Sequence, residues 1–170
     1  TSIALVAHDG EPILGVVYDS VNDRLYEAVA GRGVTMNGAP LDAPETSAGP
    51  TRWFADRSLR RHPDFERLKA HFDIHFVGGA VMNVLQVLTR GESCYLKSPK
   101  PDLGGCAIWD LAAVTLMLRE CGGSACHYDG GRLHLNREKS IYFNDVGLCF
   151  ASADVDADEL LMQLKDVLGE

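Results

Sequence analysis

The segment Ile108–Gly123 reads IWDLAAVTLMLRECGG and determines how the rest of the chain is interpreted. Residues 111–118 are apolar apart from one threonine and contain no glycine or proline, which predicts a helix buried on most of its sides. Gly122 and Gly123 supply the left-handed residue that ends such a helix. Asp110 therefore lies in the first turn or at the cap, at the mouth of an otherwise apolar helix.

Two interpretations of Asp110 follow from this position. Aspartate is a preferred residue at helix N-termini, where it accepts backbone hydrogen bonds and favours the positive end of the helix dipole. Alternatively, a carboxylate held at the floor of a pocket can bind a metal ion. Spacing alone favours the cap without excluding the metal ligand.

The same segment carries a resemblance to a known family. Ile-Trp-Asp-Leu-Ala-Ala, followed by Glu-Cys-Gly-Gly, resembles the C-terminal signature of the inositol monophosphatase family. Its members are magnesium-dependent phosphomonoesterases related to the 3'(2'),5'-bisphosphate nucleotidases and, more distantly, to fructose-1,6-bisphosphatase. Further segments follow in the family's order, so that the match spans about residues 2–151: 2–6, 15–19, 25–28, 31–33, 37–41 and 77–83.

The resemblance implies an α/β fold, the layered α-β-α-β-α sugar-phosphatase sandwich. Residues 1–49 would form the tail of the N-terminal α+β subdomain, and residues 50–170 the C-terminal α/β subdomain. The stretch 40–50, rich in proline, serine, glycine and threonine, is typical of a linker between them.

The residue patterns predict individual elements in agreement with this division. Alternating and β-branched runs indicate strands, and apolar residues at helical spacing indicate helices. The expected strands are 2–7, 13–18, 24–29, a short one beginning at Trp53, 74–77, 94–96, 125–128 and 146–151, and the expected helices are 63–72, 80–88, the one from Asp110, and 154–168.

The resemblance also reveals a missing part. In the family, an Asp-Pro-Ile-Asp-Gly-Thr run and an upstream glutamate hold most of the metal sites, and neither occurs in this chain. Both would lie N-terminal to Thr1. We therefore expect the C-terminal two-thirds of a family member, with water-activating catalytic residues upstream of Thr1 and no turnover by this chain alone.

Two further features are predicted to bind substrate. Gly78, Gly79 and Ala80 precede a helix, so backbone N–H groups point outward where an anion or hydroxyl can approach, although a plain glycine turn would give the same pattern. The matching turn in the family contacts substrate. Lys97 stands near the position where inositol-specific members carry a glutamate. A glutamate accepts hydrogen bonds from ring hydroxyls, whereas an ammonium group only donates and favours a second phosphate. The alternative is that Lys97 is a solvated surface lysine without a role in substrate binding.

These residues imply a specific chemistry by resemblance. Asp110 would be a metal ligand for Mg²⁺ on the leaving-group side, and Gly78, Gly79, Ala80 and Lys97 would orient a small phosphorylated substrate, either an inositol phosphate or a nucleoside 3',5'-bisphosphate. The alternative is a catalytically empty homologue or fragment of the same fold that serves as a binding or structural module.

Composition limits the partners. The net charge of -8 argues against a nucleic-acid surface, and no apolar run approaches the ~20 residues of a membrane span. Five cysteines without a paired spacing predict reduced thiols and a cytoplasmic protein. A zinc site from Cys121, Cys126 and His127 is disfavoured because no second Cys/His pair accompanies it. A homodimer is possible by analogy with the family.

Overall fold

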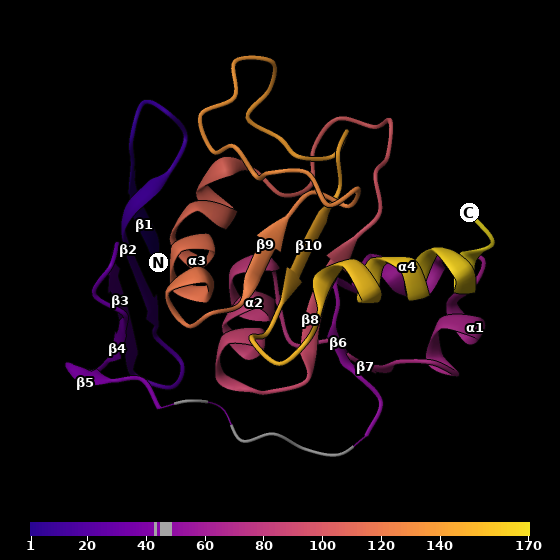
Figure 1. Ribbon diagram of the computed structural model, residues 1–170, viewed down its shortest axis with the longest axis horizontal. Coiled ribbons are helices and arrows are strands. Elements are labelled where there is room, and N and C mark those ends of the chain that lie inside the picture. Colours follow the sequence, from indigo (N-terminus) through magenta and orange to yellow (C-terminus); the bar gives the residue numbers. More distant parts are fainter. Residues whose placement is uncertain (43, 45–48) are drawn as a thin grey trace.

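The computed structural model describes residues 1–42, 44 and 49–170, which form four layers in the order sheet, helices, sheet, helices. Figure 1 shows the first sheet at the left, followed by α2 and α3, then the second sheet, and then α1 and α4. These are four consecutive layers of the predicted α-β-α-β-α sandwich, so the predicted fold class is confirmed.

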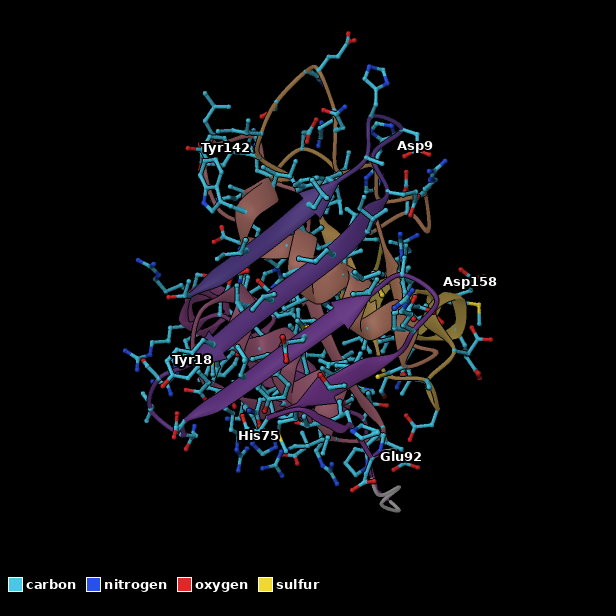
Figure 2. The ribbon with its side chains drawn as sticks, turned by 90° about the vertical axis from the view of Figure 1, so that its left-hand side faces the viewer. Asp9, Tyr18, His75, Glu92, Tyr142 and Asp158 are labelled. Carbon is cyan, nitrogen blue, oxygen red and sulfur yellow. The ribbon has the colours of Figure 1, made fainter. Side chains whose placement is uncertain are left out.

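The first sheet is antiparallel, and its strands lie in sequence order. Its members are β1 (Ser2–Val6), β2 (Pro12–Asp19), β3 (Arg24–Val29), β4 (Val34–Met36) and β5 (Ala39–Pro40). One face packs on the helices and buries Val17 and Tyr26, whereas the other leaves Ile3 59% and Leu5 55% exposed. Figure 2 shows this outer face toward the viewer, with helices behind it. The outer face of β1 and β2 is apolar because these runs carry apolar residues at positions that point to both faces of the sheet.

Helix α3 (Ile108–Glu120) fills the space between the sheets. All eight residues from 111 to 118 are buried, which confirms the predicted burial on most sides. Gly15 on β2 lets the first sheet approach the helix, because a Cβ there would lie 2.9 Å from the backbone oxygen of Ala113. The helix ends before Gly122, whose φ of +80° is the predicted left-handed conformation.

The second sheet has the order β7-β6-β8-β10-β9 and is mixed. Strand β6 runs parallel to both β7 and β8, and β10 runs antiparallel to both β8 and β9. The strands are β6 (Arg52–Phe54), β7 (Asp73–His75), β8 (Ser93–Lys97), β9 (Ser124–Cys126) and β10 (Leu148–Ala151). Helix α2 (Ala80–Thr89) covers the inner face beside α3, and α4 (Ala157–Leu168) covers the outer face beside α1 (Phe65–Lys69).

The helix predicted over 63–72 is wrong in extent. A 3-10 turn occupies Arg57–Arg61, and α1 ends at Lys69. The chain leaves the helix early because Phe72 packs edge-on against Trp53, with ring centroids 5.4 Å apart, and Asp73 then pairs with β6. Tertiary packing therefore overrides the helical pattern in residues 70–72.

The predicted linker over 40–50 is also partly wrong. Pro40 belongs to β5 and pairs with Thr35, so the sheet continues into the stretch. Residues 43 and 45–48 of that stretch lie outside the described part of the chain. The division into 1–49 and 50–170 stays a prediction. Within the described residues, no helix combines the length and the apolar character needed to cross a bilayer.

Candidate active site

The predicted substrate-binding features meet at one edge of the second sheet. Strands β7, β6 and β8 run in the same direction, so their carboxyl ends lie at the same edge. Asp56 follows β6, Gly78 follows β7, and Lys97 is the last residue of β8. Ligands of sheets with parallel strands characteristically bind at the carboxyl ends of those strands.

Lys97 forms an ion pair with Asp56 at this edge. Its Nζ lies 2.7 Å from Asp56 Oδ2, and the two side chains are 22% and 24% exposed. The hydroxyl of Tyr95 donates to the same carboxylate at 3.3 Å, and Cys106 Sγ lies 3.4 Å from the ammonium group. The cationic group is therefore held in a fixed, mostly desolvated position.

The charge states in this cluster follow from burial and pairing. Burial raises the pKa of the Cys106 thiol, so the thiol is protonated at neutral pH. Burial alone would lower the pKa of Lys97, but contacts with Cys106 and Asp56 raise it above its ordinary value. Because the thiol is neutral, we attribute the stabilisation of the ammonium ion to the Asp56 carboxylate.

The glycine turn before α2 is open to solvent. Gly79 has an ordinary φ of -77° and no atom within 4 Å of a hypothetical Cβ, so neither backbone conformation nor packing requires glycine there. In the described residues, no acceptor is seen for the backbone N–H groups of Gly79 and Ala80. Such N–H groups at a helix start can receive an anion.

Asp110 lies in the first turn of α3, as predicted. The helix N-cap is Ala107, and the Asp110 carboxylate accepts a hydrogen bond from the Ala107 backbone N–H through Oδ2 at 2.9 Å. This contact is one half of a capping box, since alanine has no side-chain acceptor to complete it. For the other oxygen, Oδ1, the described residues show no hydrogen bond. Asp110 thus acts as a cap and keeps one oxygen for a further ligand.

A polar network connects these features. The Asn83 amide donates to Asp56 Oδ1 at 3.3 Å and to the Gly78 carbonyl at 3.1 Å, which joins the glycine turn to the ion pair. Cys106 joins the ion pair to the segment that leads into α3. The structure therefore brings the glycine turn, Lys97 and the start of α3 together.

Sequence reasoning missed Asp56, Asn83, Tyr95 and Cys106. One signal pointed to Asp56, because it is a carboxylate directly after the buried strand residues Trp53–Ala55. Asn83 offered a weaker signal as an amide inside an apolar helix, where it is fully buried. For Tyr95 and Cys106 the sequence gives no comparable signal.

A divalent metal ion has an incomplete set of ligands here. The described residues contain no group of three or more histidine, cysteine, aspartate or glutamate side chains placed to hold one. Mg²⁺ prefers six oxygen ligands and retains several waters when bound through one or two carboxylates. The free oxygen of Asp110 fits as one such ligand, but these residues alone do not form a magnesium site. The same finding gives no support to zinc at Cys121, Cys126 and His127.

A separate cavity lies away from these residues. It has a volume of about 760 Å³ and is lined mainly by residues of α1 and α4 and of the segments before β6 and α4. Asp154, Asp156, Glu159 and Asp166 give it an acidic lining. None of the predicted site residues borders it, and its charge suits a phosphorylated substrate poorly.

Comparisons with known proteins agree with the fold. Inositol monophosphatase 2 from Rattus norvegicus is 31% identical over 149 residues, which cover 79% of this chain and 48% of that protein. Nus factor SuhB from Xylella fastidiosa is 29% identical over 137 residues, covering 76% and 48%. The solved inositol monophosphatase from Anabaena (Nostoc) sp. PCC 7120 superposes with a TM-score of 0.74 at 24% identity, covering 97% of this chain and 63% of that one.

The share of each protein that these matches cover decides what can be concluded from them. The chain spans about half the length of the curated relatives it matches, so their activities belong to longer proteins. The family model described as the inositol monophosphatase family matches residues 1–164, nearly the whole chain. This chain belongs to the inositol monophosphatase family.

Proposed function

We propose that this chain is the C-terminal part of an Mg²⁺-dependent phosphomonoesterase that acts on a small phosphorylated metabolite. One observation carries the proposal: the glycine turn and the Lys97–Asp56 pair lie at the carboxyl edge of strands β6–β8, and Cys106 connects them to the segment that leads into α3, whose first turn contains Asp110. Family membership supports a phosphatase of small substrates. A solved relative of the same fold is described as an IMPase/NADP phosphatase complexed with Mg²⁺ and phosphate.

Each group has a chemical role in this proposal. The free N–H groups of Gly79 and Ala80 would hold an oxygen of the phosphate or of a substrate hydroxyl. Asp110 would supply one oxygen ligand to Mg²⁺, and the remaining ligands would come from residues N-terminal to Thr1. When bound, the metal neutralises phosphate charge and lowers the pKa of a water molecule.

The substrate class is narrowed by Lys97. An ammonium group there cannot accept a hydrogen bond from a sugar hydroxyl, so simple inositol monophosphate is disfavoured relative to a bisphosphorylated substrate such as a nucleoside 3',5'-bisphosphate. Nucleotide recognition occurs on this fold, since one solved relative is described with bound 2'AMP.

A second candidate is a catalytically empty family member that binds without turnover. The observation in its favour is that the described residues contain no group of three or more histidine, cysteine, aspartate or glutamate side chains placed to hold a metal ion. A test is phosphate release with adenosine 3',5'-bisphosphate and inositol 1-phosphate, with and without Mg²⁺, on the full-length protein. Mg²⁺-dependent release supports the phosphatase. Binding of either compound without release under all conditions would support the empty homologue.

A further inference from the structure

Lys97 and Lys100 differ in how their charges are satisfied. The Lys97 ammonium is neutralised by Asp56 at 2.7 Å and is mostly buried. Lys100, three residues later, is exposed, and no ion pair or hydrogen bond of its ammonium group is found among the residues that the structure describes. An unpaired cation beside a paired one is better suited to attract a second anion.

The backbone of Lys100 is held firmly although its side chain is exposed. Its N–H donates to the Asn144 carbonyl at 2.7 Å, and the Asn144 amide donates back to the Lys100 carbonyl at 3.2 Å. Gly147 packs against the start of the same segment, where a Cβ would lie 2.5 Å from the Lys97 carbonyl oxygen. The position of Lys100 is therefore fixed by contacts with the 129–147 segment.

Gly104 and Gly105 keep the space above the two lysines open. Their φ values of +101° and +103° belong to the left-handed half of conformational space, which side chains rarely adopt. A Cβ on Gly105 would lie 3.7 Å from Lys97 Nζ and 4.0 Å from Lys100 Nζ, so both ammonium groups lie near this loop. Among the described residues no acceptor is found for the backbone N–H groups of Gly104 and Gly105, so both groups are free to donate to an anion.

The space enclosed between these residues is small. The cavity bordered by Lys97, Lys100 and the glycine pair has a volume of about 10 Å³, which is room for about one water molecule. An anion must therefore lie at the exposed rim, where Lys100 and Gly105 are accessible. The opposing charge in the same loop is Asp102, which is also exposed.

We propose that Lys100 and the Gly104–Gly105 loop form a second anion subsite, which takes a phosphate group of the substrate other than the one that is hydrolysed. The inference rests on the proposed function, but it assigns recognition of the second phosphate to Lys100 instead of Lys97. Lys97 keeps the Asp56 cluster in place, and Lys100 selects the bisphosphorylated substrate. An ammonium group provides a mobile point charge for this purpose, which suits phosphates presented at different distances.

The test compares two substrates on the full-length protein with Mg²⁺: adenosine 3',5'-bisphosphate and adenosine 5'-monophosphate. Lys100→Gln should lower the ratio of kcat/KM for the bisphosphate to that for the monophosphate about tenfold, through KM, a loss typical of one charged contact. Lys100→Arg should restore most of the ratio. Lys69→Gln, which removes an exposed lysine on α1, is the matched control and should leave the ratio unchanged. Asp102→Asn should raise it.

Two other results would overturn the subsite. The first is an unchanged ratio in Lys100→Gln. The second is a larger loss of the ratio in Lys97→Gln than in Lys100→Gln, which would return the second phosphate to Lys97. Isothermal titration calorimetry of adenosine 3',5'-bisphosphate into wild type and Lys100→Gln, under conditions without hydrolysis, measures binding alone. It therefore tests the subsite independently of the proposed phosphatase activity. If wild type hydrolyses neither compound, the phosphatase fails; the subsite stands if Lys100→Gln weakens binding about tenfold and falls if it does not.

Discussion

The Lys97 ammonium group and the Asp56 carboxylate lie 2.7 Å apart at the carboxyl ends of two neighbouring parallel strands. Asn83 connects the carboxylate to the glycine turn, and Cys106 connects the lysine to the segment before α3. The pair is thus the centre of the candidate site. Because both charges are mostly buried, each depends on the other.

Changing Lys97 to glutamate tests this dependence. The substitution places a second carboxylate beside Asp56, so we expect the free energy of unfolding to fall by roughly 2–4 kcal/mol. Lys97→Gln removes the charge without adding repulsion and should cost less. Chemical denaturation with matched m-values would measure both. Equal stability of wild type and Lys97→Glu would show that the pair has no structural role.

The same substitution also affects substrate choice. Beyond its cost in stability, Lys97→Glu should impair hydrolysis of a bisphosphate more than that of a monophosphate, since the added carboxylate and the unpaired Asp56 carboxylate would repel a second phosphate at the neighbouring Lys100. Folded fractions are checked by circular dichroism before kinetics. Equal losses on both substrates would indicate an effect on folding alone.

Asp110→Asn separates the cap from the metal ligand. The asparagine side-chain oxygen can still accept from the Ala107 N–H, so the free energy of unfolding should change by less than about 1 kcal/mol. Loss of the carboxylate charge should lower Mg²⁺-dependent turnover of the full-length protein by two or more orders of magnitude, roughly the scale of removing one key catalytic group. Retained turnover would reduce Asp110 to a cap.

Acid should loosen the segment that holds Lys100. A hydrogen bond from Arg137, at 2.6 Å, lowers the pKa of Asp145 from 3.8 to about 2. Because the folded-state pKa is depressed, the pair stabilises the fold above pH 3.8, and the stabilisation is lost as the pH falls through about 2. Denaturation curves should therefore show a steeper acid loss for wild type than for Asp145→Asn.

An exposed aspartate provides the control for that measurement. Asp42→Asn should follow the wild-type pH dependence, because it leaves the Arg137–Asp145 pair intact. If the free energies of unfolding of Asp145→Asn and wild type fall in parallel between pH 3.8 and about 2, the Arg137–Asp145 pair does not stabilise the 129–147 segment.

The outer face of the first sheet should cause association of residues 1–170. Ile3 and Leu5 are exposed on the edge strand β1, which pairs with β2 alone in the described sheet, and exposed apolar strands at an edge recruit other chains. Leu5→Lys should shift the protein toward monomer in light-scattering measurements. Val21→Lys, at an exposed apolar residue in the turn after β2, should have no such effect. A monomeric wild type at high concentration would contradict this expectation.

The α/β class could be predicted from the sequence because the buried helix that begins near Asp110 and the strand patterns around it are strong local signals, whereas the order of the layers followed from the resemblance to the family. The network around Asp56 could not. It depends on β6 and β8 becoming parallel neighbours, although 38 positions separate Phe54 from Glu92, the residue before β8. The ion pair of Lys97 could not be predicted for the same reason, since the sequence identifies the lysine but not the carboxylate that neutralises it.

The most direct measurement is Mg²⁺-dependent phosphate release from adenosine 3',5'-bisphosphate by purified residues 1–170 and by the full-length protein. Asp110 supplies one carboxylate, and one monodentate ligand holds Mg²⁺ weakly. We therefore predict no turnover by residues 1–170 alone, and turnover that depends on both Mg²⁺ and Asp110 once the residues N-terminal to Thr1 are present. Turnover by residues 1–170 alone would contradict the account and would require a metal site built from other acids, with Asp9, Asp19 and Asp129 the first to test.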